Sequence, residues 1–206
     1  MSRITQVDAQ QPGRELKRIL DSSLMTLEDA PNFLKVLANS AAALKAYVES
    51  DKALLNGQLT PRFREQIALA VAEINDSKYC LVAHSVASNY AGLTGEEVEM
   101  ACHATASDPK SQALLHFTQA IVLQRGKISD ADFCALGQAG FSQSELVEVI
   151  ANIVHNIFSN YLNLVARTEI DLPTLPPDAG VPRHKIRAGS VECPVQSSVK
   201  PLRQSP

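Results

Sequence analysis

The sequence has no long apolar run and no apolar leader, and each absence excludes a class of protein. Runs such as "IALAVA" are far shorter than the ~20 residues that a membrane-spanning helix needs. The opening "MSRITQVDAQQPGREL" lacks the apolar core of a secretory signal. We therefore expect a cytoplasmic protein with no membrane partner.

Cysteine is also scarce, and its spacing excludes two further classes. The four cysteines at positions 80, 102, 134 and 193 show neither the density of a secreted disulfide scaffold nor the paired spacing of a zinc site. In a reducing compartment they begin as free thiols. The sequence therefore predicts no bound metal and no cofactor.

Basic charge is not in excess over the main part of the chain. Residues 1–171 have 14 Lys and Arg against 20 Asp and Glu, whereas residues 172–206 have 5 against 2. Phosphate binding needs a basic surface, so this acidic body argues against a nucleic-acid partner. A hydrophobic content of 45% with 20% charged residues is ordinary for a globular protein.

The chain does contain many residues that mark the starts of helices, while strand signals are nearly absent. Thr60-Pro61 and Asp108-Pro109 each place a capping side chain before a proline at the first helical position. The strings "TGEE" from Thr94 and "SQSE" from Ser142 are capping boxes. Together these signals predict helices that start near residues 61, 95, 109 and 143, with further helices over 31–48, 78–91 and 129–137.

Short connections between these helices predict antiparallel neighbours in an all-α bundle, with one helical domain over residues 31–171. Residues 1–30 form an N-terminal segment before it. Residues 172–206 contain seven of the eleven prolines and show no helical or strand period. We expect this tail to be extended or disordered.

The stretch "NDSKYCLVAH" places one cysteine and one histidine four residues apart. If Asp76 or Ser77 caps the next helix, Cys80 lies in its first turn, where unpaired N–H groups favour a thiolate. His84 then lies on the same face as Cys80. A helical wheel directs Cys80 inward with Ala83, Val86, Ala87 and Tyr90, puts His84 at the rim, and leaves Ser85, Ser88 and Asn89 outside.

Spacing alone does not decide the role of this cysteine. A lone cysteine on an apolar helical face is more often a small core residue than a nucleophile. Glu65 is equally ambiguous, since a glutamate in the first turn of a helix can simply stabilise the helix dipole. Any thiol chemistry requires that the sulfur be ionised and reachable from solvent.

A longer string, "REQIALAVAEINDSKYCLVAH" from Arg64 to His84, resembles the carboxymuconolactone decarboxylase and alkylhydroperoxidase D family. The thiol-active branch of that family has a glutamate, a Cys-x-x-Cys beginning twelve residues later, and a histidine four residues beyond. The strings "LLHFTQAIV" and "NYLNLVARTEIDLP" extend the resemblance over roughly residues 31–173. The resemblance implies a helical bundle assembled as a homo-trimer or homo-hexamer.

By this resemblance Cys80 attacks a hydroperoxide, His84 acts as its base, and Glu65 orients His84 in a proton relay. Ser77 replaces the first cysteine of the motif and cannot form the resolving disulfide, so an external thiol reductant is expected. Two alternatives stay open. Glu65 and His84 could act as acid and base on a small organic acid or lactone, or the protein could be an inactive family member.

Two further residues are candidates for supporting roles. Tyr79 lies where some members of the family have a second histidine, but its ordinary pKa of ~10 makes it a poor substitute near neutral pH. His155 lies among asparagines that recur at helical spacing, and either these amides form a hydrogen-bonded seam between helices or His155 lines the Cys80 pocket. The asparagines are Asn152, Asn156, Asn160 and Asn163.

Overall fold

The computed structural model describes residues 2–8 and 30–172, so most of the N-terminal segment and the tail beyond Leu172 lie outside the described residues. Every regular element within those two ranges is a helix, and they contain no strand. The prediction of an all-α fold is confirmed. The elements are α2 (Asn32–Leu37), α3 (Ala41–Leu55), α4 (Pro61–Ile74), α5 (Lys78–Tyr90), α6 (Gly95–Cys102), α7 (Pro109–Gln124), α8 (Asp130–Gln138) and α9 (Gln143–Ala166).

Local capping explains where four of these helices begin. The side chains of Thr60, Asp108, Thr94 and Ser142 each accept a hydrogen bond from the backbone N–H three residues later. At Thr94 and Ser142 a glutamate carboxylate in turn accepts a hydrogen bond from the backbone N–H of the cap residue. The predicted starts near residues 61, 95, 109 and 143 are therefore confirmed.

The prediction of a single helix over residues 31–48 is wrong, because the helix is interrupted between α2 and α3. Ser40 is the cause: its backbone is extended, and its hydroxyl accepts a hydrogen bond from the N–H of Ala43 at 3.2 Å. The Asn39 side chain supports the break by donating to the carbonyl of Val36 at 2.9 Å. After the break, α3 continues to Leu55, seven residues past the predicted end.

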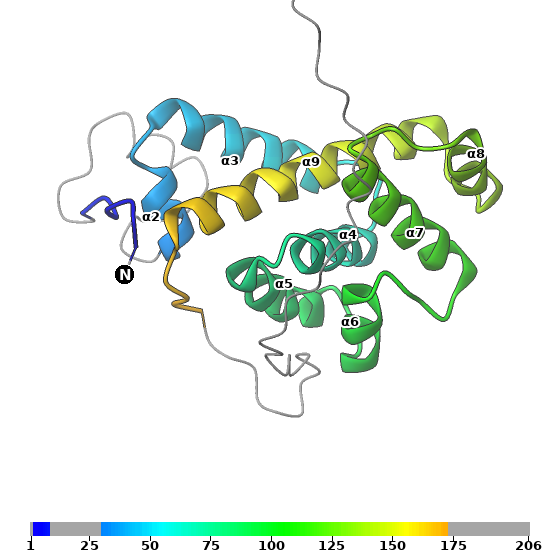
Figure 1. Ribbon diagram of the computed structural model, residues 1–206, viewed down its shortest axis with the longest axis horizontal. Coiled ribbons are helices and arrows are strands. Elements are labelled where there is room, and N and C mark those ends of the chain that lie inside the picture. Colours follow the sequence, from blue (N-terminus) through cyan, green and yellow to red (C-terminus); the bar gives the residue numbers. More distant parts are fainter. Residues whose placement is uncertain (1, 9–29, 173–206) are drawn as a thin grey trace, which may run out of the picture.

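Helix α4 lies at the centre of the fold and α9 runs along the molecule. All residues from Gln66 to Ala72 are buried, and α4 packs against α5, α6, α7 and α9. Figure 1 shows α9 passing from α8 at one end to α2 at the other. Glu148 on α9 fixes the start of α4, because its carboxylate accepts the N–H groups of Gln58 and Leu59 at 2.7 and 3.2 Å.

The burial of α5 differs from the helical wheel at three positions. Ser85 and Ser88 are buried, although the wheel placed them outside, and Tyr90 is 90% exposed, although the wheel placed it in the apolar sector. The reason is that α5 packs against both α4 and α9, and small serine side chains allow the helices to approach closely. The buried face of α5 is therefore determined by its packing against α4 and α9 as well as by the hydrophobicity of its residues.

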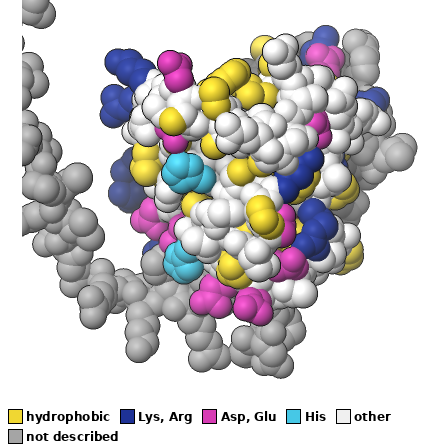
Figure 2. Space-filling view, turned by 90° about the vertical axis from the view of Figure 1, so that its right-hand side faces the viewer, with side chains coloured by type: hydrophobic (Ala, Val, Ile, Leu, Met, Phe, Trp, Pro, Cys, Tyr) yellow, Lys and Arg dark blue, Asp and Glu magenta, His cyan; other side chains and the backbone are white. Residues whose placement is uncertain are grey.

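The apolar character of the described helices and the distribution of charge on one face of the molecule bear on two of the predictions from the sequence. None of the helices in the described ranges is long and apolar enough to cross a membrane. On the face that Figure 2 presents, acidic and basic side chains are interspersed, and the described residues form no continuous basic surface there.

Candidate functional site

The site begins at the N-terminus of α5, where the predicted side-chain cap is absent. Ser77 occupies the N-cap position, but its hydroxyl makes no capping hydrogen bond, and Asp76 has a left-handed backbone with φ of 53°. The other capped helices have an extended N-cap residue, whereas Ser77 has φ −89° and ψ 85°. The backbone N–H groups of the first turn, which includes Cys80, therefore donate no hydrogen bond to the Ser77 hydroxyl.

Cys80 is buried in an apolar cluster, and its sulfur also has two polar neighbours. Its residue is 3% exposed, so the expectation of a solvent-reachable thiol is wrong in this structure. The side-chain amide of Asn163 donates a hydrogen bond to Sγ at 3.3 Å, and the thiol faces Ser159 Oγ at 4.0 Å. An N–H donor stabilises negative charge on sulfur. The sulfur is therefore inside the protein without being enclosed by aliphatic groups alone.

Glu65 on α4 and His84 on α5 form a pair one turn beyond the sulfur. The imidazole Nδ1–H of His84 donates to Glu65 Oε2 at 2.9 Å. The side chain of Glu65 is 20% exposed and that of His84 is 26% exposed. Burial alone would lower the pKa of His84, but the charge and hydrogen bond of Glu65 outweigh it and raise this pKa above its ordinary value. The structure brings Glu65 and His84 together, while Cys80 makes its hydrogen bonds to Asn163 and Ser159 instead.

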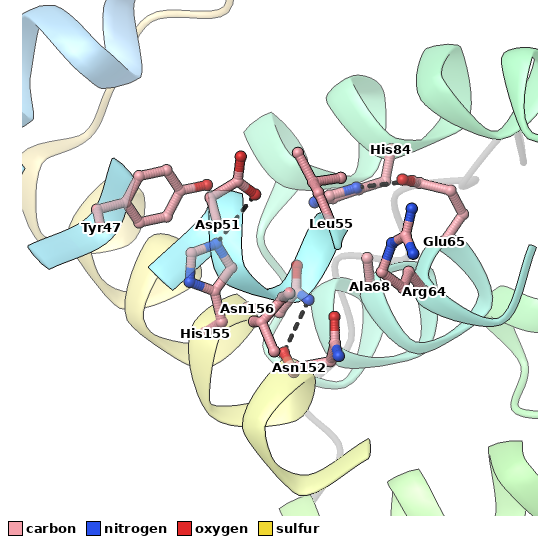
Figure 3. A pocket seen from close by; sticks show the side chains of 11 residues that line it. Tyr47, Asp51, Leu55, Arg64, Glu65, Ala68, His84, Asn152, His155 and Asn156 are labelled. Carbon is pink, nitrogen blue, oxygen red and sulfur yellow. Dashed lines mark hydrogen bonds and ion pairs between the residues drawn. The ribbon is translucent and has the colours of Figure 1, made fainter. Parts of the chain in front are cut away.

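The Glu65–His84 pair lines a pocket of about 400 Å³, counting the space that opens to solvent. Figure 3 shows Tyr47, Asp51 and His155 grouped apart from this pair in the same pocket. His155 Nε2 lies 3.5 Å from Asp51 Oδ1, and its ring stacks on Tyr47 with centroids 4.4 Å apart. His155 therefore lines the pocket of Glu65 and His84, whereas Cys80 is not among the residues that line it.

Sequence reasoning missed Tyr47 and Asp51. Their spacing of four places them on one face of α3 and could have revealed them, but the predicted helix ended at residue 48 and left Asp51 outside. Other lining residues that went unassigned are Arg64 and Leu55.

Tyr47 connects the pocket to the buried sulfur, because it lines the pocket and also packs against the apolar cluster that contains Cys80. Burial raises the pKa of Tyr47, and the neighbouring negative charges of Asp51, Cys80 and Glu65 raise it further. The phenol is consequently protonated throughout the physiological pH range. Tyr47 therefore gives the pocket lining a neutral hydroxyl group.

The four asparagines of α9 are buried, and two of them form the predicted hydrogen bonds between helices. The amides of Asn152 and Asn156 donate to backbone carbonyls one turn earlier in the same helix. Asn160 Oδ1 accepts from the side chain of Asn75 at 3.1 Å, which joins α9 to the end of α4. Asn163 does more than hold helices together, because its partner is the Cys80 sulfur.

The hydroxyl of Tyr79 makes hydrogen bonds that hold parts of the fold together. Its hydroxyl donates to Asp171 Oδ1 at 3.0 Å and accepts the backbone N–H of Phe33 at 3.3 Å. Burial raises the pKa of Tyr79, so this phenol also remains protonated. These contacts tie α5 to α2 and to the segment after α9, and none of them involves Glu65 or His84.

The other described cysteines lie away from the sulfur of Cys80. Cys102 packs in a separate apolar cluster beside α6, where burial raises its pKa to about 12, and Cys134 is exposed on α8. Cys193 lies outside the described residues. Within residues 2–8 and 30–172 no disulfide forms, and no three His, Cys, Asp or Glu side chains gather as metal ligands.

Fold and site together define an all-helical protein with a buried thiol beside a histidine–carboxylate pair. Residues 40–123, which hold Glu65, Cys80 and His84, match the model of the carboxymuconolactone decarboxylase family. This segment belongs to that family, and the resemblance indicated by the sequence is confirmed. Among curated proteins, none matches the chain at a significant level.

Solved structures share the fold at low sequence identity. A peroxidase-related protein with an alkylhydroperoxidase AhpD core from Ralstonia eutropha JMP134 is 21% identical with a TM-score of 0.72, covering 82% of this chain and 92% of that chain. A peroxidase-related protein from Silicibacter sp. TM1040 is 21% identical with a TM-score of 0.64, covering 87% and 97%. The debrominase Bmp8, in a cysteine-to-alanine variant bound to tribromopyrrole, is 16% identical with a TM-score of 0.68, covering 83% and 92%.

Proposed function

We propose that the protein reduces hydroperoxides with Cys80 as its single nucleophilic thiol. The observation that carries this proposal is the hydrogen bond of 3.3 Å from Asn163 to Cys80 Sγ in the first turn of α5. Such a donor stabilises the thiolate, which is the nucleophilic form of cysteine. The Glu65–His84 pair, one turn further along α5, provides the proton for the leaving group.

In this reaction the Cys80 thiolate attacks one peroxide oxygen, so that a sulfur–oxygen bond forms and the oxygen–oxygen bond breaks. The leaving alkoxide takes a proton from the His84 imidazolium and departs as an alcohol. The raised pKa of His84 keeps this proton available at higher pH than in a free imidazole. Cys80 does not line the pocket, so the peroxide reaches the sulfur only when side chains rearrange, and Tyr47, which lines the pocket and packs against the cluster of Cys80, is the candidate to move.

The test is peroxide consumption by the purified protein, followed by mass spectrometry of Cys80. Wild type should form a sulfenic acid at Cys80 and turn over with an added thiol. Cys80→Ala should abolish consumption, and Glu65→Gln should slow it by about tenfold or more. Cys134→Ala serves as the matched control, because that thiol is exposed on α8 and should be dispensable. A protein whose Cys80 stays unmodified at millimolar peroxide would instead be an inactive member.

One observation favours a second candidate, acid–base catalysis on a small organic acid or lactone. Glu65, His84 and Arg64 line the pocket, whereas Cys80 does not. In this alternative Arg64 would bind the substrate carboxylate while the Glu65–His84 pair moves a proton. Decarboxylation or lactone conversion that survives in Cys80→Ala and is lost in Glu65→Gln would assign this function and exclude the thiol reaction.

The assembly belongs to the same proposal: the protein forms a homo-oligomer through the exposed face of α9. Every exposed residue of α9 between positions 147 and 165 is apolar or aromatic. A surface helix normally presents polar residues to water, so a helix with this composition is covered by another apolar surface. A second copy of the chain presents such a surface, and no charged group has to be buried in the contact.

A further inference from the structure

A second cavity lies between the start of α5 and the end of α9. Its volume is about 690 Å³, counting the space that opens to solvent. It shares no residue with the pocket of Glu65 and His84. The thiol reaction proposed above gives this cavity no role.

Three buried polar atoms of residues in the cavity wall lack a hydrogen-bond partner within the described part of the chain: Ser77 Oγ, Asn163 Oδ1 and Thr168 Oγ1. The residues Ser77 and Asn163 are 1% and 4% exposed. Buried polar groups are almost always hydrogen-bonded. Three such atoms in one wall indicate that a polar ligand group completes their hydrogen bonding.

The charges around the cavity favour an anion on that ligand. Lys78 and Arg167 line it, against the single carboxylate of Asp76. The N-terminus of α5, a helix of 13 residues, adds the positive end of its dipole. Leu164 and Ile170 supply an apolar surface beside these charges. A small molecule with an anionic end and a short aliphatic stem fits this combination.

The cavity is one side chain away from the sulfur. Asn163 lines it and at the same time donates its amide N–H to Cys80 Sγ at 3.3 Å. Ser77, three residues before Cys80, lines it as well. A ligand held by Lys78 and Arg167 reaches Cys80 when the Asn163 side chain moves.

We propose that this cavity binds the low-molecular-weight thiol, bearing a carboxylate, that reduces Cys80 after its oxidation. The inference rests on the thiol function proposed above. The thiolate attacks the sulfenic sulfur of Cys80, forms a mixed disulfide and releases hydroxide, which is protonated to water. A second thiolate then attacks the sulfur of the bound thiol, so that a symmetrical disulfide leaves and the Cys80 thiolate is restored.

The experiment compares mercaptopropionate with mercaptoethanol, two small thiols that differ chiefly in a carboxylate. After oxidation of Cys80 by one equivalent of peroxide, the rate of reduction is measured for each, normalised to the thiolate concentration. The double variant Lys78→Gln, Arg167→Gln should slow mercaptopropionate by about tenfold and leave mercaptoethanol nearly unchanged. Lys45→Gln is the control, because that exposed lysine on α3 only pairs with Glu49.

Equal loss with both thiols, or no loss with either, overturns the proposal. A second readout needs no peroxide: thiol–disulfide exchange at Cys80 with anionic dithiobis(nitrobenzoate) and with neutral dithiodipyridine, located by peptide mass spectrometry. The double variant should slow only the anionic reagent. If peroxide fails to oxidise Cys80 but this selectivity is present, the peroxidase function is wrong and the anionic cavity is retained. If oxidation occurs without the selectivity, the cavity assignment is wrong.

Discussion

At the scale of single residues, two side chains relate Cys80 to two different chemical environments. Tyr47 packs against the apolar cluster that contains Cys80 and also lines the pocket of Glu65 and His84. Asn163 donates to the sulfur and also lines the cavity of Lys78 and Arg167. In the proposed reaction, proton transfer and anion binding would be provided by separate groups, so that each could be altered without the other.

The coupling of Glu65 and His84 predicts a specific pH dependence. Because Glu65 raises the pKa of His84, Glu65→Gln should lower that pKa and shift the alkaline fall of peroxidase activity to lower pH. A histidine whose pKa is raised by folding contributes stability below its unfolded pKa of ~6.5, and this contribution is lost as pH rises through the folded pKa. The stability lost in Glu65→Gln should thus be larger at acidic than at alkaline pH.

Urea unfolding of both proteins at several pH values, together with an NMR titration of the His84 ring, checks this prediction. His116→Gln provides the matched control, since that exposed histidine lies 3.9 Å from Asp132 and far less of its side chain is buried. A pH-independent stability difference for Glu65→Gln would show that the pair is not an ion pair in solution.

The hydrogen bond from Asn163 predicts a change in thiol reactivity. Asn163→Leu keeps a side chain of similar size but removes the donor to Cys80 Sγ. Hydrogen bonds to charged groups contribute about 1.5–3 kcal/mol, part of which is offset by the greater nucleophilicity of a more basic thiolate. Alkylation of Cys80 by iodoacetamide near neutral pH should therefore slow by about threefold or more, as measured by peptide mass spectrometry. Unchanged alkylation would remove the observation on which the peroxidase proposal depends.

At the scale of helices, local signals were predictable and tertiary ones were not. Thr94 and Ser142 cap their helices through residues three positions away, so the sequence contains the whole interaction. Ser85 is buried because α5 meets both α4 and α9, and no sequence window contains both neighbours. Asp51 was missed for a different reason, since the predicted helix ended at residue 48 whereas α3 continues to Leu55.

The candidate site likewise has a part that could be predicted from the sequence and a part that depends on tertiary packing. The resemblance of the sequence to a known family led us to propose Cys80, His84 and Glu65 together, and α4 and α5 do bring Glu65 and His84 into contact. The donor to the sulfur, Asn163, comes from a helix more than eighty residues away in sequence. Only the packing of α9 on α5 reveals it.

The capping box at the start of α9 predicts a stability change without a change in chemistry. Ser142→Ala removes the acceptor for the N–H of Glu145 and should cost about 1 kcal/mol in the free energy of unfolding. Ser144→Ala, two residues later in the first turn of the same helix and also exposed, should stay within about 0.5 kcal/mol of wild type. Chemical denaturation measures both. The alkylation rate of Cys80 should be the same in the two variants, because Asn163 lies near the other end of the helix.

At the scale of the whole molecule, the two faces of α9 have opposite characters. The inner face presents buried asparagines to the thiol site, while the outer face exposes Val147, Ile150, Val154, Phe158, Tyr161 and Val165. A helix of 24 residues is about 36 Å long, so this outer face extends over much of the molecule. The helix that supports the site is thus also the one expected to contact a second copy.

This arrangement predicts that charge at the centre of the outer face dissociates the oligomer. Val154→Glu combined with Phe158→Glu would bury two unpaired carboxylates in the contact, so light scattering after gel filtration should show monomers where wild type is oligomeric. Leu123→Glu, which changes a similarly exposed apolar residue on α7, should leave the oligomer intact. A monomeric wild type at tens of micromolar would contradict a contact between copies. If deletion of residues 173–206 from that monomer then increased binding of a hydrophobic dye, the tail would be what covers the outer face of α9.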